Sequence, residues 1–296
     1  MDLLALPSVG ALCALGSAFT WAVTSMLART LHPPLNSVSI NAIRSTVAGV
    51  VLLGWVVAVD GVGVMTSMSA TTFGLLALSI AIAVGVGDNF FFESSRTVGL
   101  ASAMTIATSY PLITTVLAAL VLGETITMWV VGGGVLTLAG VVLIVTGAQR
   151  RAERHEHYGR GVAAAVLASL AWGIAPILMK APLQEMDAAA IQSVRLPVAA
   201  ALLWVTPWAR GAVRQLVEGG QGIVGRMALL SLLTVFSSVM YVAGIKYAGV
   251  AVGSILSSVA PMFAIPLGVI FLQERLSTGA VLGILVTIVG VIVLQF

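Results

Sequence analysis

Long apolar runs separated by short polar breaks dominate the pattern of residues along this chain. The breaks at Pro, Gly and charged positions predict ten spanning helices, each with about the 20 apolar residues that cross a bilayer. We place these helices at residues 8–29, 36–59, 71–93, 100–122, 127–147, 161–180, 188–208, 227–246, 250–272 and 278–296. The strongly polar stretch 149–160 predicts a solvated linker between two halves, 1–148 and 161–296.

The composition indicates a membrane protein, since 59% of the residues are hydrophobic and 8% are charged, against about 25% charged in soluble domains. A single cysteine cannot form an intramolecular disulfide. The three histidines lie in polar breaks rather than in spans, so we expect no metal site and no cofactor. The net charge of +3 is scattered over loops, which does not favour nucleic-acid binding. The expected partners are the lipid bilayer and a small-molecule substrate, and the sequence leaves the oligomeric state open.

The two halves repeat one another. Trp21 and Arg44 recur 151 residues later as Trp172 and Arg195. An odd number of helices in each half requires that the halves have opposite orientations in the membrane. The expected fold is therefore an all-α polytopic membrane protein with two inverted five-helix repeats. At a shift of 150, the matched residues are Gly99, Ala101, Pro111, Glu124, Gly133 and Gly140 with Gly249, Ala251, Pro261, Glu274, Gly283 and Gly290.

The basic residues of the short loops predict the orientation, because cytoplasmic loops carry an excess of Lys and Arg. Only Lys180 and Lys246 lie on the side reached after even-numbered helices. We therefore expect a multi-pass protein of the cell membrane with the linker in the cytoplasm and both termini outside. The ten basic residues on the linker side are Arg29, Arg96, Arg150, Arg151, Arg154, Arg160, Arg210, Arg214, Arg226 and Arg275.

Ionisable residues inside spans are costly and are functional hypotheses by default. Arg44 and Asp88 lie at matching depths, roughly 12 and 10 Å from the linker side at 1.5 Å per helical residue. We therefore expect an ion pair between them. Two roles remain open for this pair: a fixed lock between the second and third helices, or a gate that takes part in proton coupling.

Arg195 differs from its mate Arg44, because the repeat places Ser238 where Asp88 would have its counterpart. A buried guanidinium without a carboxylate partner needs carbonyls, water or an anionic ligand. Recognition of a substrate carboxylate is one interpretation. The alternatives are snorkelling to the outer surface and pairing with Asp187.

Pro111 and Pro261 are expected in mid-helix, where each removes one backbone hydrogen bond. In lipid such a break is tolerated only against protein or a water-filled cavity. The hydroxyl residues beside each proline are therefore expected to line a cavity, with tight packing of small residues as the alternative. Trp21 and Trp172 lie too deep for the interfacial belt and would add aromatic surface. The expected substrate-binding set is Trp21, Arg44, Asp88, Ser109, Tyr110, Trp172, Arg195 and Ser258.

Two further pairs of repeated residues have structural interpretations. The glycines seven residues apart in the fifth and tenth spans are expected to pack closely against a neighbouring helix. Glu124 and Glu274 follow the ends of the fourth and ninth spans. We expect each to cap the N-terminus of the next helix rather than to bind substrate.

The chain resembles the EamA type of exporter in the drug/metabolite transporter superfamily over nearly its whole length. The resemblance is carried by the segments around Trp21 and Trp172, by Arg44 and Arg195, and most specifically by the runs ASAMTIATSYPLITTVLAALVLGE and AVGSILSSVAPMFAIPLGVIFLQE. It implies a ten-helix basket with a central cavity and export of amino acids or related metabolites. It also implies cytoplasmic termini, whereas the loop charges predict termini outside.

The sequence contains no H-E-x-x-H, G-x-S-x-G, Walker A or Rossmann fingerprint, so neither an enzyme nor an ATP-driven pump is favoured. The expected function is a secondary transporter that exports small metabolites, amino acids foremost, by alternating access. The drive is either a proton gradient or the substrate gradient alone. A channel, or a carrier for drugs, nucleotide sugars or lipid-like molecules, is the alternative. The inverted repeat with paired broken helices favours the transporter over the channel.

Overall fold

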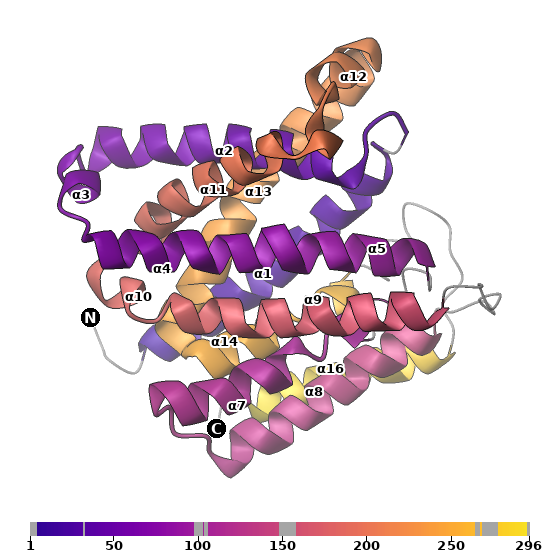
Figure 1. The fold of residues 1–296 in the computed structure, drawn as a ribbon. Coiled ribbons are helices and arrows are strands. Elements are labelled where there is room, and N and C mark those ends of the chain that lie inside the picture. Colours follow the sequence, from indigo (N-terminus) through magenta and orange to yellow (C-terminus); the bar gives the residue numbers. More distant parts are fainter. Residues whose placement is uncertain are drawn as a thin grey trace.

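The computed structural model describes residues 5–31, 33–97, 106–147, 158–263 and 278–294, together with 103 and 267. These residues form helices joined by turns and short loops (Figure 1). Among the described residues, six helices are long and apolar enough to cross a membrane, and four shorter apolar helices accompany them. The all-α membrane class expected from the sequence is therefore confirmed, while the count of ten spans stays a prediction.

The helices follow the predicted apolar runs, with α13 beginning at Gly220 rather than at 227. The first half contains α1 (Ala5–Arg29), α2 (Ser37–Val59), α4 (Ala70–Ile80), η1 (Ala81–Asp88), α5 (Asn89–Thr97), α7 (Tyr110–Leu122) and α8 (Met128–Gly147). The second half contains α9 (Tyr158–Leu178), α11 (Ala188–Val205), α13 (Gly220–Ala248), α14 (Val250–Ser257) and α16 (Thr278–Val293). The connections hold α3 (Gly63–Thr66), α10 (Pro182–Glu185), η2 (Pro207–Ala209) and α12 (Ala212–Glu218).

Capping residues fix where the second helix of each half begins. The side chain of Asn36 accepts a hydrogen bond from the backbone N–H of Ser39 at the start of α2. The Asp187 carboxylate does the same for Ala190 at the start of α11. The two caps are 151 residues apart and therefore repeat-related. The expected alternative that Asp187 pairs with Arg195 is wrong, because this carboxylate is used as a cap.

Each helix of the first half packs against a helix of the second half (Figure 1). The first helix α1 packs against α13, the third helix of the second half, and the α4–η1–α5 segment packs in turn against α9. The second, fourth and fifth helices pack as α2 with α11, α7 with α14, and α8 with α16. This scheme of contacts is unchanged when the two halves are exchanged.

The α8–α16 pair, at the lower edge of Figure 1, is held by the glycines that the sequence singled out. A Cβ atom on Gly140 would lie 2.5 Å from the backbone nitrogen of Thr287, and one on Gly283 would lie 2.6 Å from that of Ile144. These positions have no room for a side chain, so the two backbones approach directly. The expectation of close glycine packing is confirmed, and the partner of each glycine pair is the other pair.

The fourth helix of each half is interrupted at its proline. A turn at residues 108–109 precedes α7, which has Pro111 in its first turn. The equivalent turn at residues 258–259 follows α14, and Pro261 stands second in the helical residues after it. The expectation that both prolines lie in mid-helix is therefore wrong. Each begins a new helical segment, because the first turn is where a missing N–H costs least.

The outer surface of the bundle is apolar. Its most exposed large side chains include Leu120 at 79%, Val205 at 85% and Met128 at 87% of full accessibility. The core lies between the halves, where Val56 and Leu76 of the first half pack with Ile191 and Ile245 of the second. An apolar exterior around an interior that holds the polar residues is the arrangement that a bilayer requires.

Candidate functional site

An ion pair lies inside the bundle between α2 and the end of η1. The Arg44 Nη2 and Asp88 Oδ2 atoms are 3.6 Å apart, and the two side chains are 12% and 10% exposed. The pairing expected from their depths is confirmed. The Arg44 Nε atom is buried and has no hydrogen-bond partner among the described residues. Burial of the two charges is compensated only if further groups stabilise each of them.

Two repeat-related tryptophans, one from each half, supply that stabilisation. The Trp172 Nε1 atom donates a hydrogen bond of 3.0 Å to the Asp88 Oδ1 atom. At the other end of the pair, the Arg44 guanidinium carbon lies 5.2 Å from the ring centroid of Trp21. This distance is that of a cation–π contact. The four side chains therefore form a continuous chain, here called the Trp–ion–Trp chain, which runs from α1 through α2 and η1 to α9.

The local backbone of η1 makes this contact possible. Residues 81–88 form a π-helix, and the Trp172 Nε1 atom also lies 3.2 Å from the carbonyl oxygen of Ala83 within it. A Cβ atom on Gly87 would lie 2.5 Å from the Trp172 ring. Only glycine therefore allows the indole to lie against η1 beside Asp88. The sequence did not predict the π-helix, although such turns are frequent at functional sites.

Aromatic and hydroxyl side chains extend the site toward the broken fourth helix. The rings of Tyr110 and Trp172 meet edge to face with centroids 6.2 Å apart. The Tyr110 hydroxyl donates to the carbonyl oxygen of Ser254 at 3.1 Å, which links α7 to α14. The Ser109 and Ser169 Oγ atoms are 3.0 Å apart. Ser109 and Tyr110 therefore lie beside the Trp–ion–Trp chain, at the break that precedes α7.

Ser258 lies in the equivalent break after α14 and has a different environment. Its Oγ atom donates to the carbonyl oxygen of Ile255 in its own helix, at 2.7 Å, and the residue is 4% exposed. Among the described residues, no hydrogen bond or ion pair joins Ser258 to the Trp–ion–Trp chain, although the adjacent Val259 and Ala260 pack in one apolar cluster with Trp21. The neighbouring Ser254 and Ser257 hydroxyls are buried without a hydrogen-bond partner among the described residues.

Arg195 is 3% exposed and occupies a separate polar cluster. Its Nε atom donates to the Ser79 Oγ atom and its Nη1 atom donates to the Gln192 Oε1 atom, both at 3.0 Å. The Gln192 Nε2 atom in turn donates to the carbonyl oxygen of Ser238 at 3.1 Å. Snorkelling to the surface is therefore wrong. Within the described part of the chain, Arg195 has no ion pair with a carboxylate.

Gln192 is a polar partner that the sequence reasoning missed. It stands three residues before Arg195 in the run Q-S-V-R, and Asn41 stands three residues before Arg44 in N-A-I-R. Residues three apart lie on one helical face, so an amide accompanies each buried arginine. The Asn41 Nδ2 atom is buried and has no partner among the described residues. The register of the repeat was the signal that could have identified both amides.

Glu124 joins the halves from the connection between α7 and α8. Its Oε1 atom lies 2.8 Å from the Lys180 Nζ atom. Its two oxygens accept hydrogen bonds from the backbone N–H groups of Val250 and Ala251, at 3.1 and 3.2 Å. The sequence predicted that Glu124 caps the next helix, which would be α8. It instead caps α14 of the other half, while Glu274 lies outside the described residues.

A cavity of about 450 Å³ adjoins this contact and is lined by Glu124, Lys180 and residues of α8 and α14. Burial alone would raise the pKa of Glu124. The hydrogen bonds from Lys180, Val250 and Ala251 lower the pKa by more than that, so it lies below its ordinary value. The folded protein therefore favours the charged carboxylate.

The Trp–ion–Trp chain predicts strong coupling between its two charged members. Arg44→Ala leaves Asp88 buried and unpaired, and we expect it to lower the free energy of unfolding by about 3–5 kcal/mol or to prevent folding. Asp88→Asn should partly restore stability in the double variant, because it removes that unpaired charge. Thermal unfolding in detergent measures this cycle.

The exposed pair between Arg160 and Glu93, 3.1 Å apart, provides the control cycle. Its coupling should be below about 1 kcal/mol. Strictly additive effects of the Arg44 and Asp88 substitutions would contradict a coupled pair.

The contacts of Glu124 predict a pH dependence of stability. Because its pKa is lowered, its stabilisation is complete above the ordinary value of 4.5 and is lost as the pH falls through the lower value of the folded protein. Glu124→Gln should reduce stability at pH 7 by about 1–3 kcal/mol. As the pH falls below 5, the stability of Glu124→Gln should also decrease less than that of the wild type, as measured by thermal unfolding. Glu218→Gln, in an exposed pair, is the matched control, and parallel pH profiles for wild type and Glu124→Gln would contradict this assignment.

Comparisons with known proteins agree with this architecture. A solved structure titled only "Crystal structure of protein" has a TM-score of 0.76, covers 97% of this chain and 96% of that chain, and is 19% identical. This likeness shows the fold. An uncharacterized transporter of Archaeoglobus fulgidus is 23% identical over 283 residues, which are 96% of each protein.

The description "EamA-like transporter family" matches the chain twice, over residues 8–146 and 159–296. Transporters of this family are membrane proteins and not enzymes. The two matches cover most of the sequence and lie on either side of its polar linker. The resemblance inferred from the repeated tryptophans, arginines and broken helices is therefore confirmed: this chain belongs to the EamA-like transporter family.

Proposed function

We propose that this membrane transporter exports small metabolites, amino acids foremost, by alternating access between two inverted halves. The halves are residues 1–148 and 161–296, joined by the linker 149–160. The observation that carries the proposal is the Trp–ion–Trp chain, in which side chains of both halves meet at one buried ion pair. A substrate that separates these side chains would change how the two halves contact each other.

The pattern of helix contacts supports inverted halves. The first helix of each half packs on the third helix of the other half: α1 packs on α13, and α9 packs on η1 and α5. In the other three pairs, each helix packs on its own counterpart in the repeat. The fourth helices are both interrupted, at residues 108–109 and 258–259. In secondary transporters, paired interruptions near the midplane supply polar backbone groups to a substrate site.

We place the substrate between the two arginine clusters. Arg195 would bind a substrate carboxylate, since it is buried and has neutral partners in Ser79 and Gln192. Trp21, Tyr110 and Trp172 would contact an apolar side chain. The remaining members of the proposed set, Arg44, Asp88, Ser109 and Ser258, would orient polar groups or change partners during the cycle.

The contact between Glu124, Lys180 and α14 supports a gate on the face opposite the linker. It ties the end of α7 to the start of α14, so it must break if the fourth helices separate there. An ion pair with two additional backbone hydrogen bonds is specific in geometry. It is also weak enough, at a partly exposed site, to open during transport.

Two alternatives have their own signatures. A channel would give a flux that rises linearly with substrate, without counterflow, whereas a carrier saturates. Carriage of drugs, nucleotide sugars or lipid-like molecules would leave every amino acid untransported. If protons drive transport, Asp88 is the proposed carrier. Asp88→Asn should then abolish accumulation driven by a pH gradient, and the counterflow that remains should no longer depend on pH.

Reconstitution into proteoliposomes tests the proposal. We expect saturable counterflow of at least one amino acid, reduced roughly 10-fold or more by Trp172→Phe, which keeps an aromatic ring but removes the indole N–H that bonds Asp88. Trp55→Phe is the matched control, because Trp55 is 62% exposed on α2. Full activity of Trp172→Phe, or no saturable transport across an amino-acid panel, would contradict the proposal.

We further propose that the linker is cytoplasmic and that both termini lie outside, as the ten-to-two distribution of basic loop residues predicts. Cysteine labelling of intact cells tests this orientation in a Cys13→Ala background, which removes the native thiol. A cysteine at the C-terminus should react with an impermeant reagent, and one at Ala152 should not. The reverse pattern would establish cytoplasmic termini, and equal labelling would establish dual topology.

A further inference from the structure

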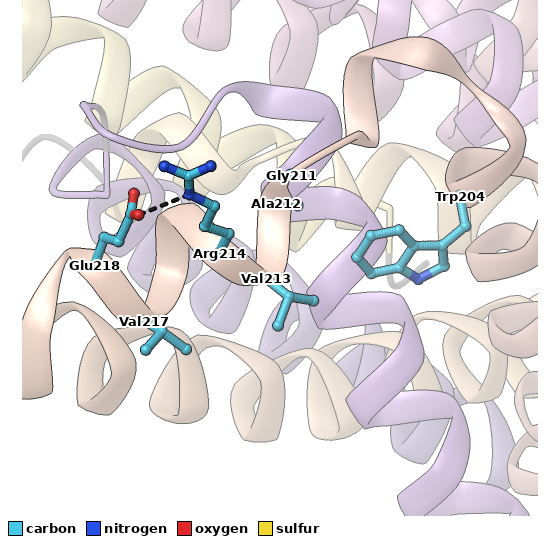
Figure 2. Close-up of a pocket in the computed structure, with 7 residues that line it drawn as sticks. All are labelled: Trp204, Gly211, Ala212, Val213, Arg214, Val217 and Glu218. Atoms are coloured by element: carbon cyan, nitrogen blue, oxygen red, sulfur yellow. Dashed lines mark hydrogen bonds and ion pairs between the residues drawn. The ribbon is translucent and has the colours of Figure 1, made fainter.

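The connection between α11 and α13 forms a groove that the proposed transport cycle does not use. Its volume is about 660 Å³, within the roughly 300–1,000 Å³ of small-molecule sites. None of its lining residues belongs to the proposed substrate-binding set. Figure 2 shows this lining, which comes from the last turn of α11 and from the region of α12: Trp204, Gly211, Ala212, Val213, Arg214, Val217 and Glu218.

The short helix α12 divides its surface into three stripes of residues four apart. Ala212 is fully buried against the bundle, and Leu216 packs on the same cluster. The next stripe is apolar but uncovered, since Val213 and Val217 are 58% and 66% exposed. An exposed ion pair, Arg214 with Glu218 at 2.7 Å, makes the third stripe.

An uncovered apolar stripe between the bundle and a charged stripe is the order expected of a helix at the membrane interface. Such a helix directs its apolar residues to the acyl chains and its charges to the headgroups. Adjacent residues extend the same boundary, since Trp208 is 63% exposed and Val205 is 85% exposed. Tryptophan is enriched at this depth of a bilayer because its ring is apolar and its N–H is polar.

The groove is held in a fixed shape by contacts with α2. The Trp204 Nε1 atom donates to the Thr46 Oγ1 atom at 2.8 Å, which fixes one wall. The Asn36 Nδ2 atom donates to the carbonyl oxygen of Trp208 at 2.9 Å, which fixes the chain that leads into α12. The groove is therefore preformed rather than dependent on a flexible loop.

The charge at the groove identifies the class of ligand. Arg214 lines the groove, and the exposed Arg210 comes directly before the lining residue Gly211 in the sequence. Glu218 is the one acidic lining residue. Both arginines are among the ten basic loop residues that the sequence predicts on the linker side. Basic residues beside an apolar surface complement a negatively charged headgroup that has hydrocarbon chains attached.

We propose that this groove binds an anionic phospholipid of the surrounding membrane. An acyl chain lies along Trp204, Val213 and Val217, and the phosphate lies at Arg210 and Arg214. The site is separate from the transport pathway, so the proposal does not depend on the transported substrate or on the mechanism of transport.

Native mass spectrometry of the full chain in detergent tests the proposal, with phosphatidylglycerol and phosphatidylcholine of identical acyl chains as probes. Each arginine near a headgroup contributes roughly fivefold in affinity. We expect tighter binding of phosphatidylglycerol, and we expect Arg210→Gln with Arg214→Gln to abolish that preference. The control variant, Arg154→Gln with Arg160→Gln, removes the same charge from the linker region and should retain the preference for phosphatidylglycerol.

A second pair of substitutions tests the apolar wall. Val213 and Val217 are exposed, so Val213→Asn with Val217→Asn should fold normally and should weaken the binding of phosphatidylglycerol at least fivefold. Displacement of the lipid by inorganic phosphate at similar concentration would overturn the proposal in favour of a simple anion site. Retained preference for phosphatidylglycerol in the arginine variant would also overturn the proposal. So would self-association of the wild-type protein that either variant abolishes, because it would show that the groove is a contact between copies.

Discussion

Removing a guanidinium and a carboxylate from water costs several kcal/mol for each ion, and Arg44 and Asp88 meet that cost inside the bundle. Their mutual attraction at 3.6 Å is not sufficient by itself. The carboxylate also needs the indole N–H of Trp172, and this contact in turn requires Gly87. The ion pair therefore constrains the packing of the third helix on α9, and it also holds the Arg44 side chain of α2 over the Trp21 ring of α1.

The second constraint is the backbone hydrogen bonding of the interrupted helices. The breaks at residues 108–109 and 258–259 free carbonyl groups that lipid cannot satisfy. Hydrogen bonds between the halves lie close to these breaks: Tyr110, which follows the first break, donates to the carbonyl oxygen of Ser254 in α14, and Thr114 donates to that of Gly173 in α9. These hydrogen bonds across the interface hold the halves in a defined register, and they must break or exchange partners if the halves move.

The features of the fold and the site that could be predicted are those that depend on the spacing of residues along the chain. Apolar runs of spanning length gave the helices, and equal depth gave the Arg44–Asp88 pair. The contact of Glu124 with α14 could not be derived in that way, because capping the next helix and capping a distant one need the same residue at the same position. The π-helix before Asp88 was missed for a related reason: its stabilising partner, Trp172, is 84 residues away.

Some features were present in the sequence but were not used. The repeat relates two helix caps, Asn36 and Asp187. It also relates two amide side chains, Asn41 and Gln192. The repeat is evident at tryptophan, arginine, proline, glycine, alanine and glutamate, because the matched residues are chemically identical. Pairs that share only a function, such as an amide or a carboxylate at a cap, require that the physical role of a residue be compared instead of its name.

The differences between the halves bear more directly on transport than the similarities do. A protein whose halves were identical would place equal charges at both arginine clusters and would give a substrate no preferred orientation. Here the first-half arginine has a carboxylate partner, while Arg195 has Ser79 and Gln192, both neutral. The net charge is therefore near zero in one cluster and positive in the other. An anionic group between the clusters, where we propose that the substrate binds, would be drawn toward the second half, because Arg44 has an acid beside it and Arg195 has none among the described residues.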